Sequence, residues 1–141
     1  MHEHKDTWAN GAAYECYIGR WSTLVARKFI ASLDISSGAT WLDVGCGTGI
    51  LSQTILDVAS PQTVLGIDSS EGYIDYAFSH IHNPHVSFRL GDAQALPVES
   101  ASYDAAVSGL VLNFVAKPNQ MLSEMIRAVC KGGTIALLKT H

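Results

Sequence analysis

The amino-acid sequence predicts an α/β domain in which a parallel β-sheet is covered by helices on both faces. Short apolar runs alternate along the chain with longer segments whose apolar residues recur every three or four positions, as strands alternate with amphipathic helices. Turns rich in glycine and aspartate follow these apolar runs, at the carboxyl ends of the predicted strands. Helical crossovers between parallel strands bring such ends to one edge of the sheet, where ligands bind.

Composition and charge narrow the class of protein. The 141 residues, 48% apolar and 16% charged, are expected to form one globular domain over 1–141. No apolar run approaches the roughly 18 residues that cross a bilayer, and no signal-type segment is apparent, so we expect a cytoplasmic protein without a membrane partner. The net charge of −4 weighs against a nucleic-acid partner. Three widely spaced cysteines are typical of free thiols.

Five segments in the first 80 residues alternate between helix and strand. Helices are recognised by apolar spacing of three and four, and strands by short continuous apolar runs. Ser69 or Ser70 can act as an N-cap, because a serine hydroxyl accepts a bond from a free N–H of the first helical turn. The predicted elements are a helix over 21–33, a strand over 40–44, a helix over 50–59, a strand over 63–67 and a capped helix to about residue 80.

The second part of the chain continues the alternation. A helix is expected to begin at Pro118, and Lys131-Gly132-Gly133 is expected to end it, with glycine as the helix C-cap. Three further strands are predicted, over 86–90, 103–108 and 134–139.

The segment from Asp43 to Ile50, Asp-Val-Gly-Cys-Gly-Thr-Gly-Ile, is the strongest functional signal. It joins a strand to a helix, and its glycines allow a ligand to approach the backbone closely. Two ligand classes use such a turn: dinucleotides, through their pyrophosphate, and nucleosides with an amino-acid tail. The dinucleotide fingerprint has glycine or alanine where this chain has Ile50, which disfavours the first class.

The segment Leu42–Gly49 closely resembles the first motif of class I S-adenosylmethionine-dependent methyltransferases, in the small-molecule, type 11, ubiquinone/menaquinone-biosynthesis-like branch. Further segments resemble that family's later motifs, so the similarity covers about residues 14–139. These segments are Gly66–Ser70, Gly91–Gln94, Phe114 and Lys131–Gly133. The resemblance implies a Rossmann-like three-layer sandwich with strand order 3-2-1-4-5 and an N-terminal helical cap over 1–35. It also implies S-adenosylmethionine as cofactor and methyl transfer to a small-molecule acceptor.

The resemblance assigns cofactor-binding roles to particular positions. Asp68, with Ser69 beside it, corresponds to the acidic end of the second strand. Its carboxylate could accept bonds from both ribose hydroxyls, whereas it would repel a 2′-phosphate. Asp92 could accept from the adenine amine, and the Ala93 N–H could donate to a ring nitrogen. As a simpler alternative, Asp68 could only cap a helix and Asp92 could only order a turn.

Further positions are expected around the methionine part of the cofactor. Gly45 and Gly47 would pack against it, Ser108 could face its amino group, and Asp43 would order the turn or help to hold the ammonium. Near the N-terminus, Tyr14, Tyr17 and Arg20 resemble the cap over the cofactor, where Arg20 could pair with the carboxylate. For Arg20 a solvated surface role is the alternative, and for the tyrosines simple packing. We expect neither a metal site at His80, His82 and His85 nor a nucleophilic Cys46, and we identify no catalytic base.

In one respect this sequence differs from the family that it resembles. Family members usually have sixth and seventh strands, which this chain lacks, so the apolar fifth strand is expected to form an exposed edge that could pair in a homodimer. Two other functions stay open: a non-catalytic or truncated module that binds S-adenosylmethionine or S-adenosylhomocysteine, and, less favoured, an NAD-dependent oxidoreductase.

Overall fold

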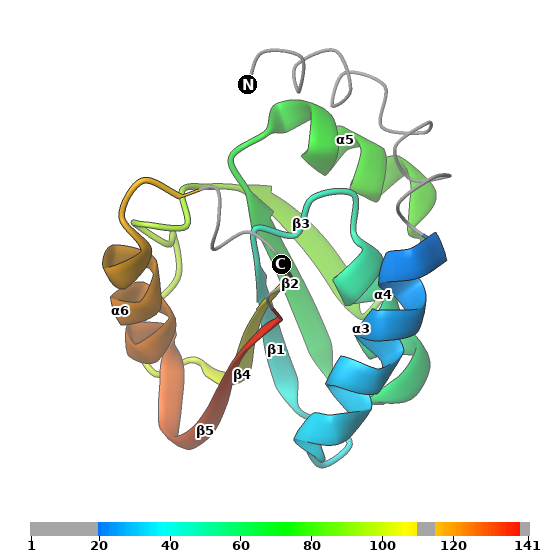
Figure 1. Ribbon diagram of the computed structural model, residues 1–141, viewed down its shortest axis with the longest axis horizontal. Helices are drawn as coiled ribbons and strands as arrows, with labels where there is room; N and C mark the ends of the chain where they lie inside the picture. Colours follow the sequence, from blue (N-terminus) through cyan, green and yellow to red (C-terminus); the bar gives the residue numbers. More distant parts are fainter. Residues whose placement is uncertain (1–19, 110–114, 139–141) are drawn as a thin grey trace.

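The computed structural model describes residues 20–109 and 115–138, with side chains from residue 23 onward. Figure 1 shows helices and strands alternating along the chain. The elements are α3 (Arg20–Leu33), β1 (Thr40–Val44), α4 (Ile50–Val58), β2 (Thr63–Asp68), α5 (Glu71–His80), β3 (Val86–Leu90), β4 (Tyr103–Gly109), α6 (Pro118–Ala128) and β5 (Val129–Leu138).

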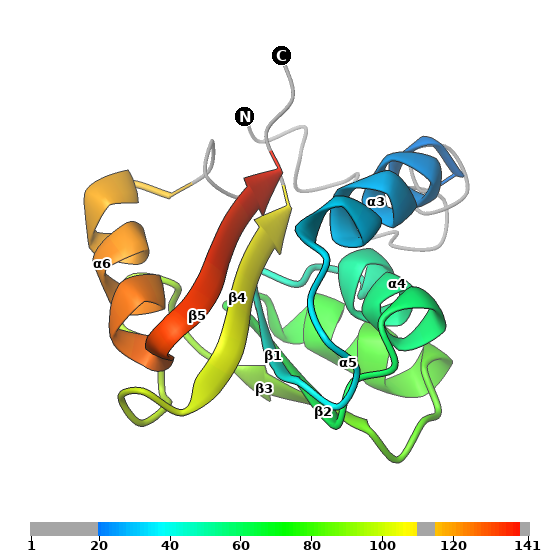
Figure 2. The same cartoon turned by 90° about the horizontal axis from the view of Figure 1, so that it is seen from below.

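The five strands form one parallel sheet in the order β3-β2-β1-β4-β5, which confirms the predicted topology. Figure 2 shows α6 on one face of the sheet and α3, α4 and α5 on the other, so the molecule has three layers. The strand order reverses between β1 and β4, because β1 pairs with β2 on one side and with β4 on the other. This reversal is where open α/β sheets bind ligands.

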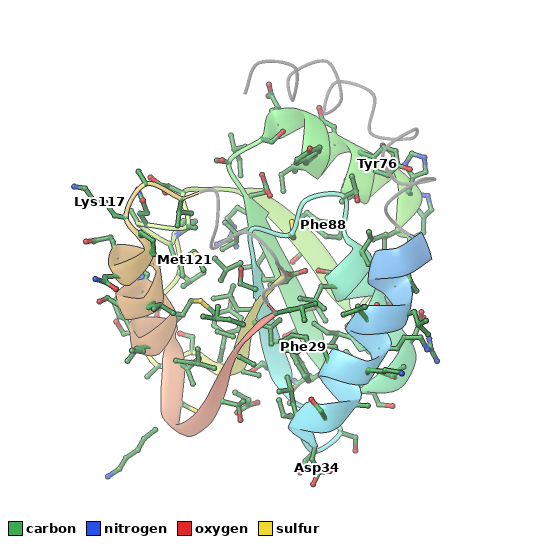
Figure 3. All side chains as sticks on the ribbon, in the orientation of Figure 1. Phe29, Asp34, Tyr76, Phe88, Lys117 and Met121 are labelled. Carbon is green, nitrogen blue, oxygen red and sulfur yellow. The ribbon has the colours of Figure 1, made fainter. Side chains whose placement is uncertain are left out.

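The alternating side chains of β1 divide the core into two clusters. Trp41 packs with Ala26 and Ile30 of α3, whereas Leu42 packs with Met121 of α6 on the opposite face. Figure 3 shows Met121 reaching from α6 toward the sheet. The predicted N-terminal cap covers residues 1–35, of which residues 1–19 are not described. In the part that is described, α3 packs into the main core.

The predicted end of the last helix is wrong. α6 ends at Ala128 and Val129 is already extended, so Lys131-Gly132-Gly133 lies within β5 and does not form a helix C-cap. The carbonyls of Arg127 and Ala128 accept bonds from the Ala101 and Ser102 N–H groups, which end the helix without a glycine. Gly133 has another role, because a Cβ there would lie 2.7 Å from the Asp104 carbonyl oxygen.

No helix in the described ranges is both long and apolar enough to span a membrane. Ser70 caps α5, as one of the two predicted serines, and its hydroxyl accepts a bond from the Tyr73 N–H at 3.2 Å.

Candidate functional site

The glycine turn between β1 and α4 lies at the edge of the sheet where the strands end. Gly45, Gly47 and Gly49 all have positive φ angles, 71°, 55° and 96°, which favour glycine. Gly49 is enclosed, because a Cβ there would lie 2.6 Å from the Ile81 side chain. A Cβ on Gly47 would meet no atom of the described residues within 4 Å, so this glycine borders open space.

Most backbone donors of this turn are already used inside the protein. The Gly45 and Cys46 N–H groups both donate to the Ile67 carbonyl, at 2.7 and 2.9 Å, and the Gly49 N–H donates to the Cys46 carbonyl. The Gly47 N–H donates to Asp68 Oδ2 at 2.9 Å. These four N–H groups of the turn are therefore not available to bind a pyrophosphate.

Asp68 ends β2 and is half-buried beside the turn. Its Oδ2 accepts from Gly47 and its Oδ1 from the Ser70 N–H at 2.8 Å. A carboxylate oxygen can accept more than one bond, so each retains acceptor capacity for a ligand hydroxyl. Asp68 thus orders both flanking segments, and its predicted ribose role stays a prediction. Ser69, next to it, is exposed.

Asp43 is almost fully buried, with 1% of its surface exposed. Ser52 of α4 donates to its Oδ2 at 2.7 Å, and its Oδ1 has no hydrogen-bond partner among the described residues. Burial, followed by the nearby Asp68 carboxylate, raises the pKa of Asp43 to about 7 even though the Ser52 bond lowers it. An orphaned buried oxygen of this kind is suited to a donor brought by a ligand.

Asp92 follows β3 and is exposed. Its Oδ1 accepts from the Gln94 N–H at 2.8 Å, and its carbonyl accepts from Ala95 at 3.0 Å, so it orders a turn that carries Ala93. The Gly91 N–H donates to the Asp68 carbonyl at 3.0 Å, which joins this turn to the end of β2. The turn-forming role of Asp92 is therefore present, and its Oδ2 has no partner among the described residues.

The remaining predicted positions differ in what the structure describes. Ser108 is buried, and its hydroxyl donates to the Val44 carbonyl at 2.8 Å, at the end of β1. Arg20 is the first residue of α3, and its side chain lies outside the described part of the chain, as do Tyr14 and Tyr17.

Cys46 and the histidines carry no catalytic or metal-binding geometry in the described ranges. Cys46 is buried, and burial, with the nearby Asp43 and Asp68 carboxylates, raises the pKa of its thiol well above the usual value, which keeps it a thiol. No group of three potential ligands lies close enough to hold a metal ion within residues 20–109 and 115–138. His80 instead stacks on Tyr76 with ring centroids 3.9 Å apart.

Sequence reasoning gave Ser52 no role at this site, although it is a buried polar residue in the first turn of α4. Its sequence signal is a serine that interrupts the apolar face of that helix. Gly66 and Gly91 belong to segments that resemble family motifs, and the structure gives each glycine a steric reason, since a Cβ would lie 2.7 Å from Phe88 at Gly66 and 2.9 Å from Pro97 at Gly91. Figure 3 shows Phe88 on the face of the sheet that α4 and α5 cover.

Three aspartates lie near the carboxyl ends of neighbouring strands. Asp43 is the fourth residue of β1, Asp68 ends β2 and Asp92 follows β3. A phosphate would be repelled by these carboxylates, whereas a cationic group and hydroxyl or amine donors would be attracted. The geometry is therefore suited to a ligand that combines positive charge with neutral donors.

Known proteins are similar to this chain in sequence. A family model described as "Methyltransferase domain" matches residues 42–137. A demethylmenaquinone methyltransferase of Symbiobacterium thermophilum is 32% identical over 120 residues, which are 80% of this chain and 47% of the relative. A malonyl-[acyl-carrier protein] O-methyltransferase of Hahella chejuensis is 31% identical over 94 residues, 67% of this chain and 34% of the relative.

A solved structure shares the fold. It is a complex between the Haloferax volcanii Trm112 methyltransferase activator and a protein described as a methyltransferase. The similarity has a TM-score of 0.83 at 27% identity and covers 92% of this chain and 57% of the other. The chain spans less than half the length of the two curated relatives above, so what those whole proteins do is not carried over by the match alone.

Proposed function

The chain belongs to the methyltransferase-domain family, and from this premise we propose that it transfers the methyl group of S-adenosylmethionine to a small-molecule acceptor. S-adenosylmethionine is the cofactor of this family. When bound, the cofactor supplies an electrophilic methyl group attached to a positively charged sulfur. One observation carries the proposal: Asp43 and Asp68 flank a glycine turn in which the N–H groups of Gly45, Cys46, Gly47 and Gly49 are already bonded inside the protein, which suits a cation better than a pyrophosphate.

The residues of the described site suit the separate parts of the cofactor. Asp68 offers unused acceptor capacity for ribose hydroxyls, and Asp92 with the Ala93 N–H offers an acceptor beside a donor for adenine. The open face of Gly47 provides surface for the methionine part, and the unpaired Oδ1 of Asp43 suits its ammonium. Gly45, Ser69 and Ser108 complete the proposed set, together with Tyr14 and Arg20 outside the described side chains.

The acceptor is less narrowly defined than the cofactor. The two named relatives act, by their names, on demethylmenaquinone and on malonyl-[acyl-carrier protein], which are different acceptors. Methyl transfer needs the acceptor atom in line with the methyl group, and it needs a base only if the acceptor must lose a proton. We assign no catalytic base among the described residues. A homodimer through β5, which forms one edge of the sheet, belongs to the same proposal.

A module that binds the cofactor without transferring its methyl group is the second candidate. It is favoured by one observation, that the site assembled here holds groups suited to the cofactor and no group assigned to the acceptor. An NAD-dependent oxidoreductase is a weaker candidate, because Ile50 stands where the dinucleotide fingerprint has glycine or alanine, and because four N–H groups of the turn are already bonded inside the protein.

Calorimetry with S-adenosylhomocysteine, using NAD as the control ligand, tests the cofactor half of the proposal. We expect micromolar affinity for S-adenosylhomocysteine, no measurable heat with NAD, and loss of binding in Asp68→Ala. A preference for NAD, or no binding to either ligand, would contradict the proposal. Transfer of a labelled methyl group to acceptor candidates then separates the enzyme from the binding module, because only the enzyme gives labelled product.

A further inference from the structure

One guanidinium group on α6 binds the loop that follows β3, residues 92–100, at three points. Arg127 donates from Nη2 to the Leu96 carbonyl at 3.0 Å and from Nη1 to the Val98 carbonyl at 2.9 Å. Nη1 also donates to the Ser100 hydroxyl at 3.1 Å. Figure 1 shows this loop, drawn in yellow-green, running beside α6. The planar fork of arginine can bridge the two carbonyls on either side of Pro97, which the single ammonium of a lysine cannot do.

Glu124, one helical turn before Arg127, fixes the orientation of this guanidinium. Its Oε2 accepts from Arg127 Nε at 2.9 Å, and its Oε1 accepts from Arg127 Nη2 at 3.0 Å. Oε1 also accepts from the Leu96 N–H at 2.8 Å. Arg127 and Glu124 therefore hold both the carbonyl and the N–H of one loop residue, with side chains only 33% and 17% exposed. The bidentate pair is stronger and more directional than a free surface ion pair.

The part of the loop that Arg127 and Glu124 hold packs directly against the residue that precedes Asp92. Pro97 lies between the two carbonyls that Arg127 binds, and its ring lies so close to Gly91 that a Cβ there would be 2.9 Å away. Gly91 immediately precedes Asp92, and the Asp92 turn is closed by Ala95 on the other side. Arg89 donates to the Pro97 carbonyl at 2.9 Å and supports the same residue from β3. A shift of Pro97 would therefore shift the Asp92 turn.

We propose that Arg127 and Glu124 are positioning residues for recognition of the cofactor's adenine: they hold the 92–100 loop so that Asp92 and the Ala93 N–H keep the spacing which the base requires. This inference rests on the proposed function. Neither α6 residue reaches the site itself, so the pair acts through the loop. The specific consequence is a loss of base selectivity, which general destabilisation of the fold would not produce.

The test compares Arg127→Lys with Arg27→Lys as a matched control. Arg27 also forms an ion pair, with Asp57 at 4.0 Å, but it lies on α3 and its side chain is 51% exposed. Calorimetry measures the dissociation constants of S-adenosylhomocysteine and of S-inosylhomocysteine, in which a carbonyl replaces the amine that Asp92 would accept from. We expect Arg127→Lys to lower the affinity for S-adenosylhomocysteine about tenfold, which corresponds to the loss of one well-placed hydrogen bond. The affinity for S-inosylhomocysteine should stay nearly unchanged. Arg27→Lys should change neither.

The possible outcomes separate this inference from the proposed function. If the unaltered chain does not bind S-adenosylhomocysteine, the proposed function fails and the inference falls with it. If the unaltered chain prefers the adenosyl ligand and Arg127→Lys keeps that preference within about twofold, only the inference is overturned.

A second variant keeps the test decisive if Arg127→Lys does not fold. Glu124→Gln retains an oxygen for the Leu96 N–H but removes the charge that orients Arg127. We expect it to lower the adenosyl preference by a smaller factor and to speed hydrogen exchange at the Leu96 amide, with unchanged exchange in β1. Unchanged preference together with unchanged Leu96 exchange would overturn the inference.

Discussion

The carboxylate of Asp68, at the end of β2, accepts a hydrogen bond of 2.9 Å from the backbone N–H of Gly47, in the turn that follows β1. The two strands are neighbours in register, with Val44 opposite Ile67, so both turns begin at the same level of the sheet. One side chain thus fixes the shape of the glycine turn while remaining at the proposed cofactor site.

Replacing Asp68 by asparagine tests how many acceptors the site needs. Both carboxylate oxygens are already bonded, to Gly47 and Ser70, and asparagine leaves one of these N–H groups facing an NH2. We expect the free energy of unfolding to fall by about 1–3 kcal/mol and affinity for S-adenosylhomocysteine to fall at least tenfold. Chemical denaturation and calorimetry measure the two effects. Asp57→Asn, on the exposed side of α4, is the control, and equal affinity in both variants would contradict the role of Asp68.

The raised pKa of Asp43 should give the protein an unusual dependence of stability on pH. Its pKa of about 7 in the folded state lies above the value of about 3.9 in an unfolded chain, so between these values the folded state binds the extra proton. The free energy of unfolding should therefore fall as pH rises from about 4 to about 7, by on the order of 2–4 kcal/mol from this group, and level off above.

Asp43→Asn tests this dependence, because it keeps an acceptor for Ser52 and removes the charge. We expect the decrease over that pH interval to disappear and the variant to be at least as stable as the unaltered chain at pH 8. Urea denaturation across the pH range measures it. A variant that retains the full pH dependence would show that another group is responsible.

Gly47 and Gly38 form a matched pair of glycines. Both have positive φ, 55° and 83°, and a Cβ on either would meet nothing within 4 Å. Replacing each by alanine should therefore cost a similar amount of stability, about 1–2 kcal/mol for a left-handed residue. Only Gly47→Ala should weaken S-adenosylhomocysteine binding, because Gly38 precedes β1 and therefore lies at the amino-terminal end of the strands, away from the site. Thermal unfolding and calorimetry distinguish the effects, and equal affinity in the two variants would show that no ligand contacts Gly47.

Substitution of the core residue Trp41 by phenylalanine is expected to change stability unusually little. Its side chain is fully buried, and its indole N–H has no hydrogen-bond partner among the described residues. Trp41→Phe removes an unsatisfied donor worth about 1–3 kcal/mol and leaves a cavity that costs a comparable amount. We expect the free energy of unfolding to change by less than about 1 kcal/mol, compared with about 2–5 kcal/mol for Met125→Ala, where only packing is lost. Denaturant titrations of both variants would reveal a hidden partner of the indole if Trp41→Phe proved equally costly.

The positions of most strands could be predicted from the sequence because that information is local, whereas the strand order came from the family resemblance. The strands over 40–44 and 86–90 agree residue for residue with β1 and β3, since short apolar runs between turns leave few alternatives. The end of α6 was not predictable in the same way. Its last carbonyls are satisfied by Ala101 and Ser102, which are distant in sequence, so the glycines at 132–133 were free to serve β5 instead.

For the candidate site, too, some features follow from the sequence and others only from the tertiary structure. The sequence by itself determined the fold class, the family and the positions of Asp43, Asp68 and Asp92, because residue type and spacing along a strand–turn–helix unit are properties of the chain. Only the tertiary structure decided what those side chains do: burial with one unpaired oxygen for Asp43, and a bond to Gly47 for Asp68. Burial and pairing depend on groups that other strands and helices bring near, and in this fold those elements are far away in the sequence.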